Sequence, residues 1–225
     1  IGTDLFLAFS PERIDPGNPT YGLRNTPKLV GGVDNVSTER AATLYRTFCE
    51  EVVALSGTRE AELAKLLENT YRQINIALVN ELARIFPALD VDVEDVLSAA
   101  ATKWNFHRYT PGVGVGGHCI PVDPYYMIQR AADVGVPAGL ITAARAVNRS
   151  MPNHVAQVLV NLLGNAIKFT DKGKVSVSVE TTAVSESAVD LSIAVRDTGI
   201  GMEEHMINRM FDPFTQADNR SEEHT

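Results

Sequence analysis

The chain has 225 residues, of which 44% are hydrophobic and 21% charged, as is typical of a globular protein with one large domain or two small ones. A formal net charge of −8 argues against a nucleic-acid-binding surface, and the apolar runs fall well short of the roughly 18 to 20 residues that a membrane-spanning helix needs. Its two cysteines, Cys49 and Cys119, are too few for a disulfide framework or a cysteine-rich zinc site, and they favour a reducing, cytoplasmic setting.

Short strands and loops are expected in the first part of the chain. Residues 4–9 and 28–33 are apolar runs typical of strands, and a loop rich in Pro, Gly and Asn separates them. A helix is expected to begin at Ser37 or Thr38. Residues 52–55 form one more strand-like run, which a Ser-Gly pair ends.

The strongest helical pattern runs over residues 60–86. Apolar residues recur there every three or four positions and so line one helix face. They are Leu63, Leu66, Leu67, Ile74, Leu78, Leu82 and Ile85. A helix of this length often packs against a partner helix, so the pattern favours a helix–helix interface.

Three polar residues share another face of the same helix. Lys65, Asn69 and Arg72 are spaced at i, i+4 and i+7. A lysine and an asparagine placed together can donate hydrogen bonds to a developing oxyanion. From the spacing alone, a solvated polar stripe without a chemical role is the preferred alternative.

The rest of the chain changes from helices to a helix followed by strands. Asp92 is a suitable N-cap for a helix over 93–101. The later patterns predict helices over 125–134, 139–148 and 155–169, and alternating strands over 174–180 and 191–195. The fold class is therefore mixed α+β: a mostly helical part, then a partial α/β sandwich with an antiparallel sheet. Whether helix 155–169 packs with the first or the second part stays open.

Cys119 follows Gly116 and Gly117 in a glycine-rich turn and precedes Asp123. Glycines let the backbone approach a ligand closely, so such a turn could present the thiol as an accessible nucleophile. A carboxylate four residues later could activate water. From the spacing alone, a buried structural cysteine is the preferred alternative. A zinc site with His118 is disfavoured because no further Cys or clustered His completes four ligands.

Three motifs, in order, resemble the UDP-sugar 6-dehydrogenase family. They are SPER at 10–13, KLLENTYRQINIALVNE at 65–81 and PGVGVGGHCIPVD at 111–123. The resemblance covers about residues 1–154 and is closer to the UDP-N-acetylglucosamine/UDP-N-acetylmannosamine branch. It implies a two-step oxidation of the C6 alcohol of a UDP-N-acetyl-sugar to a carboxylate with NAD, as in polysaccharide biosynthesis.

The resemblance also implies roles for individual residues. Cys119 would trap the aldehyde as a thiohemiacetal, which is oxidised to a thioester. Lys65 and Asn69 would stabilise the oxyanions, and Asp123 and Glu12 would position or activate water for hydrolysis. The implied substrate-binding residues are Arg72, Tyr109, Gly112, Gly116 and Gly117. The long helix over 60–86 would form a homodimer.

Parts of the family pattern are missing from the sequence. No G-x-G-x-x-G fingerprint of a dinucleotide-binding turn follows a strand-like run, and the family's UDP-binding domain is not found. The glycines from Gly112 to Gly117 do not replace that fingerprint, because they are not part of a βαβ pattern. We therefore expect the chain to bind NAD poorly and to be without full activity.

A second group of polar residues lies near the C-terminus. Asn161, Asn165 and Lys168 fall on one helix face, where an amide oxygen could bind Mg²⁺ and a lysine could bind phosphate. Asp197 begins the turn DTGIG after a strand-like run. Each feature alone is also explained by solvated side chains or a common turn.

These features together resemble the GHKL ATPase domain of sensor histidine kinases. QVLVNLLGNAIKFT at 157–170 is similar to the N box, DTGIGM at 197–202 to the G1 box, and FDPFTQ at 211–216 to the F box. The resemblance implies an ATP/Mg site, as in two-component signalling. In it, Asn161, Asn165, Lys168, Asp197, Gly199 and Gly201 would bind the nucleotide and Asn165 the Mg²⁺. The later glycine-rich box and a phospho-accepting histidine are not found.

The two resemblances predict four segments. Residues 1–55 would be the C-terminal edge of an NAD-binding domain, 56–154 a central helical domain, 155–219 a partial ATPase domain, and 220–225 a tail. The preferred interpretation is an accidental fusion of a dehydrogenase fragment with an incomplete ATPase domain. A non-catalytic dimerising fragment and an ATP-binding module are the alternatives.

Overall fold

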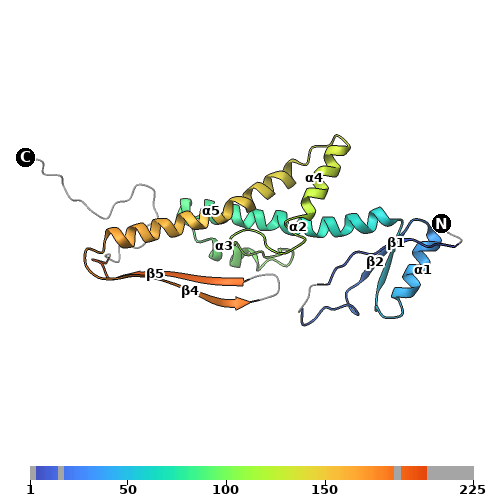
Figure 1. Cartoon of the computed structure of the whole chain (residues 1–225), viewed down its shortest axis with the longest axis horizontal. Helices are drawn as coiled ribbons and strands as arrows, with labels where there is room; N and C mark the ends of the chain where they lie inside the picture. The colour runs from blue at the N-terminus through green and yellow to red at the C-terminus, as the bar shows by residue number, and fades with distance from the viewer. Residues whose placement is uncertain (1–3, 15–17, 185–188, 202–225) are drawn as a thin grey trace, which may run out of the picture. The chain divides into compact units, whose positions relative to one another are not determined.

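The computed structural model describes residues 4–14, 18–184 and 189–201. These residues group in two compact units (Figure 1). The first unit lies within residues 1–74, 116–142 and 183–190, and the second within residues 75–115, 143–182 and 191–225. The F box and the tail predicted from the sequence lie outside the described residues.

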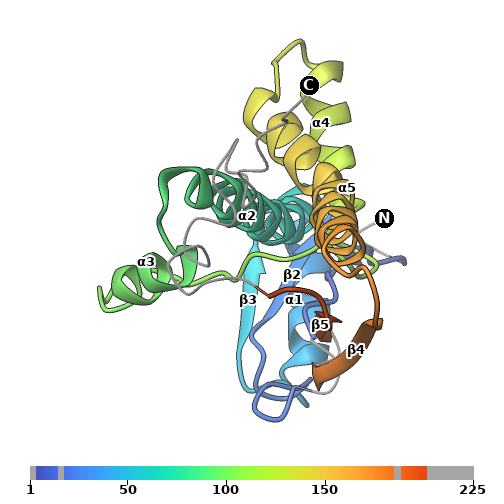
Figure 2. The ribbon, with the colours of Figure 1, turned by 90° about the vertical axis from the view of Figure 1, so that its left-hand side faces the viewer.

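A small three-stranded sheet forms the N-terminal part of the first unit (Figure 2). Its strands are β1 (Ala8–Phe9), β2 (Lys28–Gly32) and β3 (Val52–Leu55), in that order. β1 runs antiparallel to β2, and β3 runs parallel to it with Lys28 opposite Val52. The helix α1 (Asn35–Tyr45) connects the two parallel strands, which makes this part a βαβ unit.

Two predicted boundaries differ near β2. The strand expected over 4–9 is paired only at Ala8–Phe9, because β2 ends at Gly32 and the amide of Leu7 donates to the hydroxyl of Ser37 instead. α1 begins before Ser37, since the carboxylate of Asp34 accepts from the Ser37 amide at 2.7 Å and caps the helix. The same hydrogen bond lowers the pKa of Asp34.

The long helix α2 (Thr58–Ile85) has 28 residues, so its predicted extent holds to within two residues at the N-terminus. Its burial pattern is unexpected. The exposed residues of α2 include Leu63, Leu67, Tyr71, Leu78 and Ile85, whereas the buried ones include Asn69, Thr70, Gln73, Ala77 and Asn80. The buried residues of α2 are therefore mostly small or polar, with Val79 as a larger apolar one. Of the predicted apolar stripe, Leu63, Leu67, Leu78 and Ile85 are exposed, whereas Leu66, Ile74 and Leu82 are half-buried.

Two shorter helices belong to one unit each. α4 (Asp123–Asp133), in the first unit, begins two residues before the predicted start because Pro124 occupies its first turn. α3 (Val93–Ala100), in the second unit, begins after Asp92, whose carboxylate accepts from two backbone amides as predicted. A short 3-10 turn (Pro87–Leu89) follows α2.

The helix α5 (Gly139–Lys168) has 30 residues and corrects the prediction of two separate helices. It continues through Pro152, which has no amide hydrogen to donate to the carbonyl of Asn148. Gly114 lies so close to that carbonyl that a Cβ at Gly114 would be 3.0 Å from the oxygen. Tertiary packing at this position thus accommodates a proline that local sequence rules place at a helix end.

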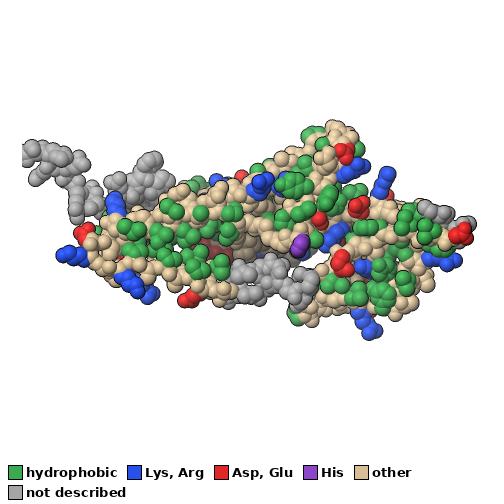
Figure 3. Space-filling model, in the orientation of Figure 1, with side chains coloured by type: hydrophobic (Ala, Val, Ile, Leu, Met, Phe, Trp, Pro, Cys, Tyr) green, Lys and Arg blue, Asp and Glu red, His purple; other side chains and the backbone are tan. Residues whose placement is uncertain are grey.

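The last two strands, β4 (Val175–Val184) and β5 (Val189–Asp197), form a two-stranded sheet after α5. The amide of Thr198 donates to Lys174, and the hydroxyl of Ser176 to Arg196, which is an antiparallel register. The strands are not half-buried as predicted, because Val177, Val179, Leu191 and Ile193 are exposed among the described residues. Figure 3 shows hydrophobic side chains gathered over this region of α5 and the hairpin.

Candidate functional site

Cys119 lies on the turn that leads into α4 and is exposed. Its carbonyl oxygen accepts hydrogen bonds from the amides of Val122, at 3.0 Å, and Asp123, at 2.8 Å. These bonds fix the turn at the start of the helix. Cys49, by contrast, is 5% exposed and its thiol donates to the carbonyl of Leu23. The buried structural cysteine is thus Cys49, and the accessible thiol expected of a nucleophile is Cys119.

Asn69 and Asp123 are in direct contact. The Asn69 side chain is buried on α2, and its Nδ2 donates to Oδ2 of Asp123 at 2.5 Å. Because the Asp123 amide also bonds the carbonyl of Cys119, three of the predicted catalytic residues are joined by hydrogen bonds. Lys65 is half-buried one turn before Asn69, and Arg72 is exposed. The link to Cys119 runs through its backbone carbonyl, and a carboxylate and an amide on the turn that carries a thiol are group types suited to carbonyl chemistry.

Glu12 belongs to the same unit and lies after β1, in a segment without regular secondary structure. Its Oε1 accepts from the amides of Arg13, at 2.8 Å, and Ile14, at 2.7 Å. Arg13 forms an ion pair with Glu68 at 2.7 Å, and Glu68 precedes Asn69 on α2. The ion pair therefore connects the Glu12 segment to the helix that carries Asn69.

The predicted substrate-binding residues are divided between the units. Gly116 and Gly117 belong to the first unit, where Gly117 has a φ of +91° that favours glycine. Tyr109 and Gly112 belong to the second. The amide of Gly112 donates to Oδ1 of Asn80 at 2.8 Å.

Asn80 is a residue that the sequence analysis missed. It is 0% exposed, and its Nδ2 donates to Oδ1 of Asn148 on α5 at 2.9 Å. Asn80 follows Asn69 by 11 residues, which is about three helical turns and returns to the same face. An asparagine at that spacing was a signal that this face of α2 is polar and buried.

The residues of the ATPase-like part lie in the second unit. Asn161, Asn165 and Lys168 are exposed side chains of α5, and Oδ1 of Asn161 accepts from Gln157. Asp197 is the exposed last residue of β5, and its carboxylate accepts from the amide of Gly199 at 2.9 Å.

The turn of the predicted G1 box is packed against the end of α5. A Cβ at Gly199 would overlap the carbonyl of Phe169, and the amide of Ile200 donates to the same carbonyl at 3.2 Å. Gly201 has a φ of +71°. The structure thus brings the ends of the predicted N and G1 boxes together.

The described residues do not provide a dinucleotide site. The strands of the sheet β1-β2-β3 are not followed by a glycine-rich phosphate turn within the described ranges, so these residues do not fit a dinucleotide. Asn165, Lys168 and Asp197 are donors and acceptors suited to Mg²⁺ and phosphate, and all three are solvent-exposed. The described part contains no group of three or more His, Cys, Asp or Glu residues that could hold a metal ion. Nor is any helix there long and apolar enough to cross a membrane.

Two family models match different parts of the chain. Residues 59–150, which include all of α2 after Thr58 as well as Cys119, match the central domain of the UDP-glucose/GDP-mannose dehydrogenase family. Residues 151–225 match the family of histidine kinase-, DNA gyrase B- and HSP90-like ATPases.

Individual relatives are UDP-N-acetyl-sugar dehydrogenases. The UDP-N-acetyl-D-glucosamine 6-dehydrogenase of Salmonella typhi is 42% identical over 166 residues, which is 71% of this chain and 38% of the relative. The enzyme of the same name from Pseudomonas aeruginosa is 37% identical over 228 residues, 98% of this chain and 52% of the relative. The solved UDP-D-ManNAc dehydrogenase of Pyrococcus horikoshii has a TM-score of 0.68 and 36% identity, over 74% of this chain and 39% of that one.

The chain thus spans between 38% and 52% of the two curated relatives. The comparisons confirm the resemblance of the first part to UDP-sugar 6-dehydrogenases. The ATPase resemblance is supported by the family match to residues 151–225. The alignment with the Pseudomonas dehydrogenase covers 98% of the chain, so a dehydrogenase sequence aligns with this part too.

Proposed function

We propose that the part of the chain up to about residue 154 carries the thiol site of a UDP-N-acetyl-sugar 6-dehydrogenase, with Cys119 as the nucleophile. The observation that carries the proposal is the hydrogen-bonded set of Cys119, Asp123 and Asn69, in which the thiol is exposed and the amide is buried. The match of residues 59–150 to the dehydrogenase central domain supports it.

The chemistry of this site begins with addition to a carbonyl. The Cys119 sulfur attacks the C6 aldehyde of the sugar, a C–S bond forms, and the carbonyl oxygen takes the negative charge. Asn69 Nδ2 retains a second N–H beside the one directed at Asp123, so it can donate to this oxygen together with the ammonium of Lys65. The product is a thiohemiacetal once this oxygen takes up the proton that the Cys119 thiol released.

The site also suits hydrolysis of a thioester at Cys119. Water adds to the thioester carbonyl, its proton passes to a carboxylate, the C–S bond breaks, and a carboxylic acid leaves while the sulfur regains a proton. Asp123 and Glu12 are the proposed acceptors, as both belong to the same unit as Cys119. Between these two steps the thiohemiacetal would be oxidised to the thioester. We assign this oxidation to the full-length dehydrogenase, because the described residues provide no dinucleotide site.

Assembly and organisation are proposed as well. The exposed stripe of Leu63, Leu67, Leu78 and Ile85 on α2 supports a homodimer through this helix. The two free cysteines support a reducing, cytoplasmic setting. The family matches meet between residues 150 and 151, which supports the proposed segment boundary near 154 and a fusion of two unrelated parts.

An ATP-binding module is the second candidate function. It is favoured by the family match to residues 151–225 and by the packing of Gly199 against the end of α5, which joins the ends of the N and G1 boxes. Under this proposal Asn165 would bind Mg²⁺, and Lys168 the phosphates.

Thiol labelling tests the first candidate, and Cys49 is its internal control. We expect iodoacetamide to alkylate the exposed Cys119 at least about tenfold faster than the buried Cys49, because reaction at a buried thiol requires local opening. UDP-N-acetylglucosamine is expected to slow labelling of Cys119 and to leave Cys49 unchanged, as quantified by peptide mass spectrometry. Equal labelling with and without the sugar nucleotide contradicts substrate binding at this site.

A further inference from the structure

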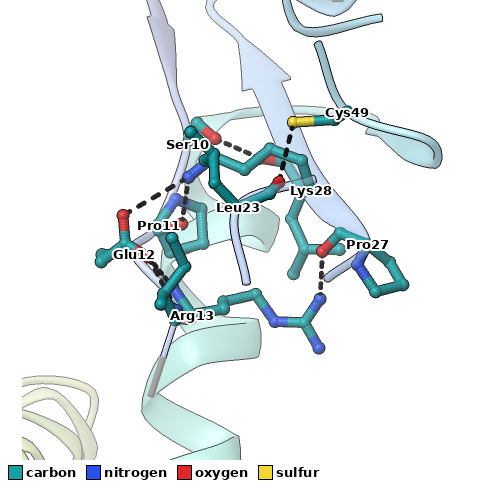
Figure 4. A network of polar contacts seen from close by, with 10 residues as sticks. Ser10, Pro11, Glu12, Arg13, Leu23, Pro27, Lys28 and Cys49 are labelled. Atoms are coloured by element: carbon teal, nitrogen blue, oxygen red, sulfur yellow. Dashed lines mark hydrogen bonds and ion pairs between the residues drawn. The ribbon is translucent and has the colours of Figure 1, made fainter. Parts of the chain in front are cut away.

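The segment Ser10–Arg13 is held in place by side chains, not by strand pairing. It follows β1 without regular secondary structure, yet it carries Glu12 (Figure 4). The hydroxyl of Ser10 donates to the carbonyl of Leu29 at 2.6 Å, and Arg13 Nη1 donates to the carbonyl of Pro27 at 2.6 Å. Both contacts reach the start of β2, so the position of this segment depends on the sheet.

Lys28 lies between these two contacts and is buried. Its side chain is 9% exposed, and Nζ donates to the carbonyl of Pro11 at 3.1 Å. The carboxylate of Glu12 lies 3.8 Å from the same nitrogen, and the Tyr45 ring centroid lies 5.3 Å from it. An ammonium is costly to bury unless carboxylates, carbonyls or aromatic faces replace its water. Here that replacement comes from the Glu12 segment and from α1.

The contacts distinguish the two carboxylate oxygens of Glu12. Oε1 accepts from the amides of Arg13 and Ile14, whereas Oε2 faces Lys28. The side chain is nevertheless 66% exposed, so the carboxylate is oriented but open to solvent. A carboxylate that removes a proton from attacking water requires both properties, since it must reach the water in one orientation.

We propose that Lys28 is a positioning residue that holds the Glu12 carboxylate in the orientation required for hydrolysis of a thioester at Cys119. The proposal rests on the proposed function of the thiol site. Lys28 contacts no reacting atom and acts through Glu12 and the carbonyl of Pro11. The Arg13–Glu68 ion pair, with 2.7 Å between Nη2 and Oε1, connects the same segment to α2 next to Asn69.

Acetylation of Cys119 isolates the hydrolytic step without a cofactor. p-Nitrophenyl acetate transfers its acetyl group to the Cys119 sulfur and releases p-nitrophenolate. Water then cleaves the C–S bond of acetyl-Cys119 and gives acetate and the thiol. Release of p-nitrophenolate reports the first step, and intact mass after removal of the reagent reports the second. Cys119→Ser gives the background of both.

We expect Lys28→Met to slow hydrolysis roughly tenfold, a fraction of the effect of a general base, and to leave acetylation within about twofold. Lys28→Arg is expected to retain most of the rate because it keeps a buried cation. Lys103→Met, a change at an exposed lysine, is the matched control and should match wild type. If Lys28→Met does not fold, Lys28→Gln gives the same comparison, since it can donate to Pro11 but carries no charge.

A double-mutant comparison separates positioning from general damage. In a Glu12→Gln background, Lys28→Met should slow hydrolysis no further, because the group that it positions is gone. A further loss in that background, or an equal loss in acetylation and hydrolysis, overturns the proposal.

Hydrogen exchange separates failure of this proposal from failure of the proposed function. The amides of Arg13 and Ile14, which bond Glu12, should exchange faster in Lys28→Met than in wild type. Unchanged exchange and unchanged hydrolysis overturn the role of Lys28, even where Glu12→Gln slows hydrolysis. If Glu12→Gln does not slow hydrolysis, the function proposed for Glu12 is wrong, whatever the exchange of its segment shows.

Discussion

At the scale of single residues, two buried asparagines on α2 determine which segments pack against this helix. Asn69 is 6% exposed and bonds Asp123, and Asn80 is 0% exposed and bonds both Gly112 and Asn148. A buried amide is stabilising only when its donor and acceptor are both satisfied in one geometry. Asn69 therefore fixes the start of α4 against α2 in the first unit, and Asn80 fixes the loop at Gly112 and α5 against α2 in the second unit.

Replacement of Asn80 tests this role. We expect Asn80→Ala to lower the free energy of unfolding by about 3 kcal/mol, because the Gly112 amide and the Asn148 amide oxygen each lose a buried partner. Urea unfolding followed by circular dichroism gives the value. Asn161→Ala, at an exposed position of α5, is the control, and its effect should stay within about 0.5 kcal/mol. Two variants of equal stability contradict the role of Asn80.

Helix α5 and its connection to the hairpin show how packing acts at the scale of elements. The helix ends where Gly199 packs against the carbonyl of Phe169, and the hydroxyl of Thr170 donates to Ala166 at 2.7 Å. Gly164, inside the same helix, has no atom within 4 Å of the position of an added Cβ. Close packing therefore requires a glycine at 199, whereas the open space at 164 would accept a side chain.

Paired alanine substitutions distinguish these environments. Gly164→Ala should raise the free energy of unfolding by about 0.5–1 kcal/mol, since alanine is the better helix former and the space is open. Gly199→Ala should lower it by about 2 kcal/mol or more, because the methyl group overlaps a backbone carbonyl that cannot move independently. Thermal and urea unfolding give both values. A stabilising Gly199→Ala would show that the hairpin does not pack on α5 in this way.

The whole molecule combines two family matches with two compact units, and their boundaries differ. The family matches divide the chain at residue 150, whereas each compact unit is built from three separate chain segments. Both α2 and α5 contain residues of each unit. Adding a ligand that is specific for one of the two family-like parts therefore tests whether that part binds it without any effect on the other part.

The second candidate function makes such a test possible. It predicts that Mg²⁺–ATP at about 1 mM raises the melting temperature, since a ligand that binds only the folded state stabilises it by mass action. Asn165→Ala should remove the shift, while labelling of Cys119 by iodoacetamide stays as in wild type. An unchanged melting temperature contradicts the ATP-binding candidate without affecting the thiol site, which the labelling experiment tests separately.

Local signals in the sequence determined several elements correctly. The apolar period predicted α2, Asp92 predicted the start of α3, and residues 52–55 form β3 as expected. The motifs at 65–81 and 111–123 place Asn69 and Asp123 among the expected site residues, and the structure brings these two side chains into contact, while their catalytic roles stay predictions. The predicted helices and the strand depend on residues within a few helical turns of one another, whereas the Asn69–Asp123 contact joins residues 54 positions apart.

Only the tertiary structure decided which surfaces are buried and where elements end. Leu63, Leu67 and Leu78 of α2 are exposed while Asn80 is buried, and α5 continues through Pro152, where the loop at Gly114 packs beside the carbonyl of Asn148. β1 is short because a hydroxyl 30 residues away, on Ser37, takes the amide of Leu7. Each of these outcomes depends on a contact with a residue that is distant in the sequence. Hydrophobic periodicity and secondary-structure propensity are local properties, so they do not predict such contacts.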